Sequence, residues 1–100
     1  MKYTIDKQEK YSLLKLHEDK LDSSIAPGLK SELITIHAEG VKNIILDLTE
    51  VKYTDSSGLS ALLVGNRVVQ ENGGIFILAC LSDHTTKLIK ISQHIIYSNH

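Results

Sequence analysis

The sequence has few of the residues on which several classes of protein depend. It contains one cysteine, one proline, one phenylalanine and no tryptophan among its 100 residues. A single cysteine cannot form an internal disulfide, which excludes a disulfide-stapled scaffold and fits a reducing cytoplasm. That residue, Cys80, ends an apolar run over residues 75–80. We therefore expect it to fill the core rather than to act as a nucleophile.

Long apolar runs and an excess of one charge are also missing. No stretch approaches the roughly 18 apolar residues that a membrane-spanning helix needs, and residues 1–4 lead into the chain without the apolar region of a signal peptide. The net charge is -1 with dispersed basic residues, so no basic patch suggests nucleic acid. These absences predict a cytoplasmic protein. The 42% of hydrophobic residues is enough for the core of one small domain.

Apolar patterns predict five strands along the chain. Residues 3–5 and 11–17 alternate between apolar and polar on either side of a polar break, which indicates two strands joined by a short turn. Residues 43–48 and 75–79 are nearly continuous apolar runs, which is typical of strands covered on both faces. Residues 94–97 are expected to form a last strand at the edge of the sheet.

Helical spacing predicts three helices among these strands. The first begins at residues 22–24, where an Asp or a Ser is expected to cap it, and stops at Gly40. The second follows a polar turn at residues 54–58 and ends at residues 72–74, and the third begins at residues 82–83. Strands and helices in this alternating order predict an α/β fold with a parallel sheet and right-handed crossovers.

The polar turn, with the sequence TDSSG over residues 54–58, lies between a buried strand and an apolar helix. Asp and Ser side chains accept hydrogen bonds from the unpaired N–H groups of a helix's first turn. Gly58 lacks a side chain that would block a close approach. A helix N-terminus also tolerates an anion, so a phosphoserine at Ser56 or Ser57 is chemically reasonable. Capping alone would explain the same residues, so their spacing does not identify a function.

The second helix is more apolar than a surface helix needs to be. When its residues are placed around a helix axis at about 100° per residue, one side is apolar and another is polar. The positions between these two sides are also apolar. These flanking residues are Ala61, Val64 and Val68. Two interpretations stay open: the helix is buried more deeply than usual, or the flank is a surface on which a protein partner docks beside Ser57.

Other chemistries lack their characteristic patterns. The five histidines show no paired spacing of a metal site. A serine hydrolase would need a G-x-S-x-G elbow, and Asp55 is a poor base for a serine hydroxyl at neutral pH. Gly73 and Gly74 precede a strand rather than a helix, so they do not form a phosphate loop. We expect no enzyme, no metal and no cofactor.

Leu46-Asp47-Leu48, Val51 and Asp55-Ser56-Ser57-Gly58-Leu59 together resemble the signature of bacterial anti-sigma factor antagonists, the STAS domain family. The similarity extends from about residue 11 to residue 97. It implies one small STAS-like domain over residues 1–100, with a mostly parallel sheet, an N-terminal antiparallel strand and sequentially wound helices. Related domains usually continue into a final amphipathic helix. No such helix precedes His100, so either it is absent or the sequence given is incomplete.

The resemblance also implies a function. Ser56 matches the family's first motif serine, which is the phosphorylation site. Unphosphorylated, such a protein binds a kinase-type anti-sigma factor and frees a sigma factor, and after phosphorylation it releases its partner. The alternative is a scaffold of the same fold that does not switch, or a module that holds a nucleotide or another anion at the helix N-terminus.

The resemblance carries partner contacts onto further residues of the motif and its surroundings. One departure affects them: Leu21-Asp22 matches a pair in the family that usually follows a glycine, and that glycine is not present here. The residues expected to contact the partner are Asp22, Thr54, Asp55, Ser57, Gly58, Leu59, Ala61, Val64 and Val68.

Overall fold

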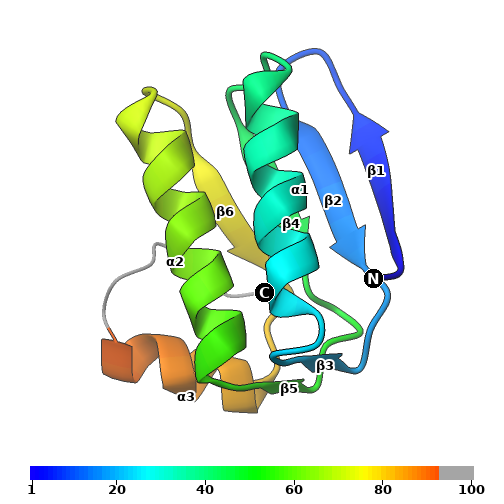
Figure 1. The fold of residues 1–100 in the computed structure, drawn as a ribbon, viewed down its shortest axis with the longest axis vertical. Coiled ribbons are helices and arrows are strands. Elements are labelled where there is room, and N and C mark those ends of the chain that lie inside the picture. The colour runs from blue at the N-terminus through cyan, green and yellow to red at the C-terminus, as the bar shows by residue number, and fades with distance from the viewer. Residues whose placement is uncertain (93–100) are drawn as a thin grey trace.

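The computed structural model describes residues 1–92 as a sheet with two helices across one face (Figure 1). The main sheet has four strands in the order β1-β2-β4-β6. Their bounds are Tyr3–Lys7, Ser12–Leu16, Ile44–Asp47 and Phe76–Ala79. β1 is antiparallel to β2, whereas β2, β4 and β6 are parallel. The expectation of a mostly parallel sheet with an N-terminal antiparallel strand is confirmed.

Alternate residues of the central strands form the core beneath the helices. Leu14 pairs with Leu46, which pairs with Leu78, and all three side chains are fully buried. Ile45 and Ile77 point to the opposite face, because successive side chains of a strand alternate, and both are only half-buried. The expectation that residues 43–48 are covered on both faces is therefore wrong for the second face.

Over residues 1–92 the helices are α1 (Ala26–Ala38), α2 (Ser56–Glu71) and α3 (Asp83–Ser92). In Figure 1, α1 and α2 lie side by side over the sheet, and α3 crosses below α2 at the end where both other helices begin. In Figure 1, α1 and α2 start at the end of the sheet where the parallel strands have their carboxyl ends, as connections between parallel strands do. Within residues 1–92 no helix is both long and apolar enough to cross a membrane.

The predicted side-chain cap of α1 is wrong. The N-cap residue is Ile25, and no side chain bonds to the helix start. The carboxylate of Asp22 instead accepts hydrogen bonds from the amide of Ser24 at 3.0 Å and from its hydroxyl at 2.6 Å. These bonds build a turn before the helix, so the acidic side chain is already engaged when α1 begins.

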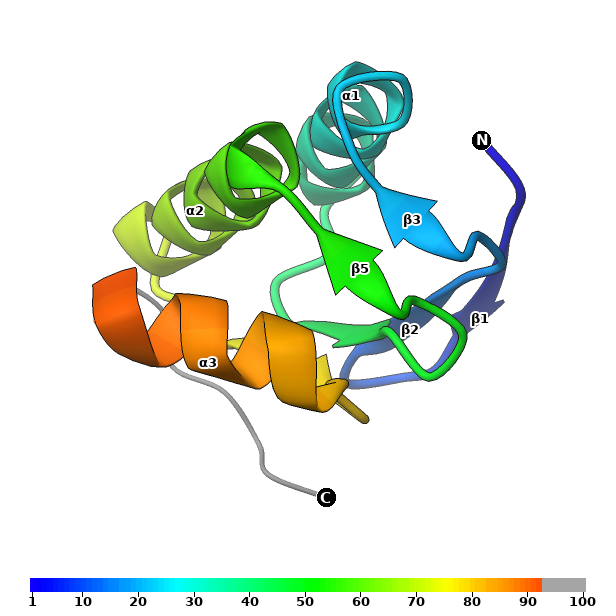
Figure 2. The same cartoon turned by 90° about the horizontal axis from the view of Figure 1, so that it is seen from below.

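A second, two-stranded sheet was not predicted. It pairs β3 (Lys20–Leu21) with β5 (Tyr53–Thr54) in parallel, and Figure 2 shows it beneath the starts of α1 and α2. Strands of two residues carry no readable periodicity, so no pattern in the sequence indicated them. Their pairing places the turn of residues 54–58 beside Leu21 and Asp22.

Two predictions concern the C-terminal part of the chain: that Cys80 fills the core, and that residues 94–97 form a strand. Cys80 follows β6 at a bend, with a φ of 59°, and is half-buried rather than a fully buried part of the core. The predicted strand over residues 94–97 lies outside the described residues.

The sequence correctly indicated a close approach at Gly58. This residue lies in the first turn of α2 and is buried against β3. A Cβ at this position would overlap the carbonyl oxygen of Leu21 and would lie 2.8 Å from the Cγ of the same residue. Because the nearest obstacle is backbone, a side-chain rotation could not relieve the overlap.

We expect Gly58→Ala to lower the free energy of unfolding by about 1–3 kcal/mol, because α2 must move away from β3. Gly28→Ala is the matched control, since a Cβ there would meet only the Cβ of Met1 at 3.7 Å. Gly28 lies inside α1, so the control should be neutral or stabilising by up to about 1 kcal/mol. Urea unfolding measures both variants, and equal stabilities would contradict the close-approach argument.

Candidate functional site

The turn predicted to cap a helix does cap one. Asp55 is the N-cap of α2, with an extended backbone, and its carboxylate accepts a hydrogen bond from the amide of Gly58 at 2.9 Å. Ser56 and Ser57 are the first two residues of the helix. Ser56 is exposed and Ser57 is half-buried, so the Ser56 hydroxyl is the more accessible of the two.

The backbone of this turn is attached to β3. The amide of Asp55 donates to the carbonyl of Leu21 at 3.2 Å, and the amide of Leu59 donates to the carbonyl of Asp55 at 2.9 Å. The first bond continues the pairing of β5 with β3 by one residue. Both ends of the motif are therefore held by backbone hydrogen bonds, which do not depend on the serine side chains.

Helix α3 holds the same turn from another side. The hydroxyls of Thr54 and Thr85 lie 2.9 Å apart and both residues are buried. The Nε2 atom of His84 lies 2.9 Å from the carbonyl oxygen of Thr54. Because a carbonyl can only accept, this nitrogen carries the proton. The His84 ring also stacks on Tyr53, with centroids 4.8 Å apart and planes 25° apart.

These contacts were missed at the level of sequence. Thr54 and Thr85 are 31 residues apart, and no short motif links them. Of this arrangement, the sequence predicted only the start of α3. Ser82 was one of two residues predicted to cap it, and the Ser82 hydroxyl does accept a hydrogen bond from the Thr85 amide at 3.2 Å.

Asp22 lies directly after β3, in the same region of the molecule as the turn. Two hydrogen bonds to the carboxylate of Asp22 lower its pKa below the ordinary value. The larger effect comes from the hydroxyl of Ser24 and the smaller one from the amide of Ser24. Asp22 lines a shallow depression with Glu18, Asp19 and Lys20, and this depression does not include Ser56. Asp22 and Ser56 are thus presented on neighbouring but separate surfaces.

A different depression adjoins Ser56. It has a volume of about 400 Å³ and lies between the N-terminal halves of α1 and α2. We call it the α1–α2 depression. Its lining residues are Ser23, Ala26, Pro27 and Lys30 on the α1 side and Ser56, Ser57 and Ser60 on α2.

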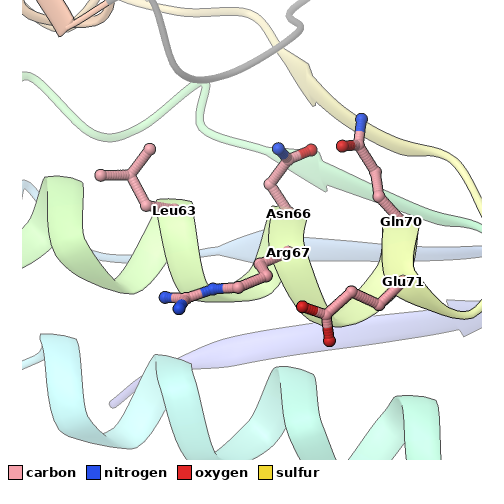
Figure 3. A pocket seen from close by; sticks show the side chains of 5 residues that line it. All are labelled: Leu63, Asn66, Arg67, Gln70 and Glu71. Carbon is pink, nitrogen blue, oxygen red and sulfur yellow. The ribbon is translucent and has the colours of Figure 1, made fainter.

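A further depression of about 370 Å³ follows α2 away from the motif (Figure 3). Leu63, Asn66 and Gln70 project from one side of the helix, and Arg67 and Glu71 from the other. No catalytic arrangement is evident among these side chains. Within residues 1–92 no group of three or more His, Cys, Asp or Glu side chains is placed to hold a metal ion.

The structure narrows the predicted partner surface. Ala61 is fully buried, Thr54 is 1% exposed and Gly58 is buried, so the expectation that these three residues offer a contact surface is wrong. Ala61 is covered because it belongs to the core cluster, and Thr54 because α3 packs on it. Val64 and Val68 are half-buried and continue from Ser60 at a spacing of four residues. Leu59 and Ser57 are half-buried as well.

Comparison with known proteins assigns the family. The model of the STAS domain matches residues 3–96. The chain belongs to the STAS domain family. One relative within this family is BtrV of Bordetella bronchiseptica, whose name describes it as a candidate anti-sigma factor antagonist. It is 28% identical over 92 residues, which cover 92% of this chain and 78% of BtrV.

Solved structures share the STAS fold at lower identity. The anti-sigma factor antagonist SpoIIAA in its unphosphorylated form is 19% identical, with a TM-score of 0.78 over 99% of this chain and 89% of SpoIIAA. The phosphorylated form of SpoIIAA from Bacillus gives a TM-score of 0.76 over 99% and 93%. TM1081 of Thermotoga maritima is 18% identical, with a TM-score of 0.81 over 97% and 86%. At these identities the likeness shows the fold alone.

We expect the buried hydroxyl pair to behave as a coupled unit in stability measurements. Thr85→Val alone leaves the Thr54 hydroxyl buried without Thr85, its hydrogen-bond partner, which should cost about 1–3 kcal/mol. Thr54→Val should cost less, because the Thr85 hydroxyl still accepts a hydrogen bond from the Ser82 hydroxyl at 3.1 Å. Replacing both removes the unpaired group, so the double variant should cost clearly less than the sum of the single variants. A double-mutant cycle from urea unfolding measures this, and strictly additive costs would show that the hydroxyls do not interact.

Proposed function

We propose that this protein is an anti-sigma factor antagonist whose binding to its partner is switched by phosphorylation of Ser56. The observation that carries the proposal is the position of Ser56, which is exposed at the first residue of α2 within the Asp55–Gly58 cap. Support also comes from the names of BtrV and SpoIIAA, and from the fact that SpoIIAA occurs in a phosphorylated and an unphosphorylated form.

The proposed partner is an anti-sigma factor that is also a kinase. Phosphoryl transfer needs ATP, magnesium and a catalytic base, and all three belong to the kinase. This chain has to present only a hydroxyl on a fixed backbone. The Ser56 hydroxyl meets that requirement because Asp55, and not a serine, serves as the helix cap. The proposed contact residues are Asp22, Asp55, Ser57, Leu59, Val64 and Val68, which lie around Ser56 or along the flank of α2.

The proposed switch acts through local charge and shape. A phosphate adds about -1.5 to -2 charges at a helix N-terminus, which favours anions, while Asp55 opposes it by like-charge repulsion. The net effect on the fold is therefore small. A partner shaped for a neutral hydroxyl must bury the phosphate against a surface that supplies no cation of its own, which is costly. Changing from nearly full to nearly absent binding takes a differential of roughly 5.5 kcal/mol.

A second candidate is a STAS module that binds a nucleotide or another anion without switching. The α1–α2 depression favours it, because it adjoins the start of α2 and includes the cationic Lys30. This candidate predicts saturable binding of ATP or GTP by the unmodified chain, measured by calorimetry. The phosphorylation switch does not require this chain to bind a nucleotide, and instead predicts covalent labelling of Ser56.

We expect a cognate kinase and ATP to label the native chain at Ser56, and we expect Ser56→Ala to abolish the label. Ser57→Ala is the matched control, one residue further along α2, and should retain the label. Because Asp55 provides the cap, Ser56→Ala should change the free energy of unfolding by no more than about 0.5 kcal/mol. Mass spectrometry maps the site, and full labelling of Ser56→Ala would refute the assignment.

The flank of α2 offers a second matched pair. Val64→Glu should place a charge in the proposed interface and weaken partner binding at least tenfold, with only a modest loss of stability. Ala61→Glu buries the same charge in the core and should unfold the domain or lower its melting temperature steeply. Thermal melts and binding titrations separate the two effects. A large drop in melting temperature for Val64→Glu would reject the interface.

A further inference from the structure

We infer that Lys30 of α1 pairs with the phosphate group when Ser56 is phosphorylated, so that the modified side chain is held over the α1–α2 depression. The inference rests on the proposed function, because it concerns the phosphorylated form of Ser56. It assigns Lys30 as a positioning residue for that form, with no role in the chemistry of phosphoryl transfer.

The first support is the lining of the depression. Lys30 and Ser56 lie on its opposite walls, one on each helix. Among the described residues that line it, Lys30 is the one charged side chain, and the other polar groups are hydroxyls. A phosphate over this depression therefore meets a cation and hydroxyl donors, without a carboxylate in the lining.

The second support is the orientation that Asp55 imposes. Its carboxylate already occupies the amide of Gly58, which is one of the donors that a phosphate at the helix start would otherwise use. The same carboxylate repels a phosphate on the adjacent residue. The phosphate is thereby directed away from the cap, and the α1–α2 depression is the concave surface that adjoins Ser56.

The third support is that Lys30 is available for a new partner. It is half-buried on α1, and neither ion pair found within residues 1–92 includes it. Its helical neighbours at a spacing of three or four residues are Ala26, Pro27, Leu33 and Ile34, none of which is acidic. The lysine side chain is long and flexible, so its ammonium can move to a phosphate without any change of backbone.

The consequence is a defined surface for the phosphorylated form. A phosphate held by Lys30 covers the depression and joins α1 to α2 near Ser57 and Ser60. The partner then meets a new anion at a fixed place along the side of α2 that continues to Val64.

The experiment measures the second pKa of phosphoserine, which is ordinarily about 6. Phosphoserine is inserted at position 56 during translation, so no kinase is needed, and the 31P chemical shift is titrated from pH 4.5 to 8. A cation beside the phosphate favours its dianion. We expect the pKa in the otherwise native chain to lie about 0.2–0.7 units below that in Lys30→Gln, the shift expected for an exposed charge pair.

Two variants serve as controls. Lys30→Arg keeps the cation and should keep the lowered pKa. Lys42→Gln removes the same charge beside Gly73, at the far end of a 16-residue helix, roughly 24 Å from Ser56. At that distance the charge is screened, so the pKa should equal that of the native chain. Raised salt should shrink the difference between the native chain and Lys30→Gln.

The outcomes are distinct. Equal pKa values in the native chain and Lys30→Gln would overturn the pairing, as would an equal change in Lys42→Gln. Should Lys30→Gln fail to fold, the slowed exchange of the Lys30 ammonium protons, seen by 15N NMR in the phosphorylated chain only, decides instead, and unchanged exchange would overturn the pairing. Failure of a kinase to label Ser56 would refute the proposed function and leave this measurement unaffected.

Discussion

The contact between the carbonyl of Leu21 and the first turn of α2 is the constraint on which the site depends. That carbonyl accepts the amide of Asp55, and it lies where a Cβ of Gly58 would be. A helix can begin this close to a strand only where glycine removes the side chain. The contact joins the segment that precedes α1 to the segment that precedes α2. It thereby fixes the position of Ser56 relative to the whole N-terminal half of the chain.

Helix α3 completes this arrangement from the opposite side of β5. The buried hydroxyl of Thr54 bonds to Thr85, and the carbonyl of Thr54 accepts from His84. The residue that precedes the cap is therefore held by its backbone and by its side chain. A serine presented by so well-held a turn can change its charge without moving the elements around it, because rearrangement would break buried hydrogen bonds. This is the physical basis of the proposed switch, which would act on the partner rather than on the fold.

Much of the fold was predictable because its elements are long or strongly patterned. The apolar run over residues 43–48 predicted β4, and the turn at residues 54–58 predicted both the start of α2 and the close approach at Gly58. The two-residue strands β3 and β5 were not predictable, since pairing between them depends on segments more than thirty residues apart. The depth of burial of Ala61 was equally hidden. The position of Ala61 on the helix did not predict which flank of α2 would face α1. That choice depends on how two helices distant in sequence pack together.

The electrostatics of the site follow from a conflict between two anions. Asp55 stabilises the start of α2 as a carboxylate, and a phosphate on Ser56 would compete for the same donors and the same partial positive charge. Without a cation nearby, phosphorylation would weaken the cap that positions the modified residue. Lys30, across the α1–α2 depression, offers a separate place for the phosphate charge and leaves the cap to Asp55. The internal effects of phosphorylation then largely offset one another. In the proposed switch, the free-energy difference between the two forms would thus be expressed almost entirely in the complex, where the partner would have to accommodate a phosphate that Lys30 already holds in place.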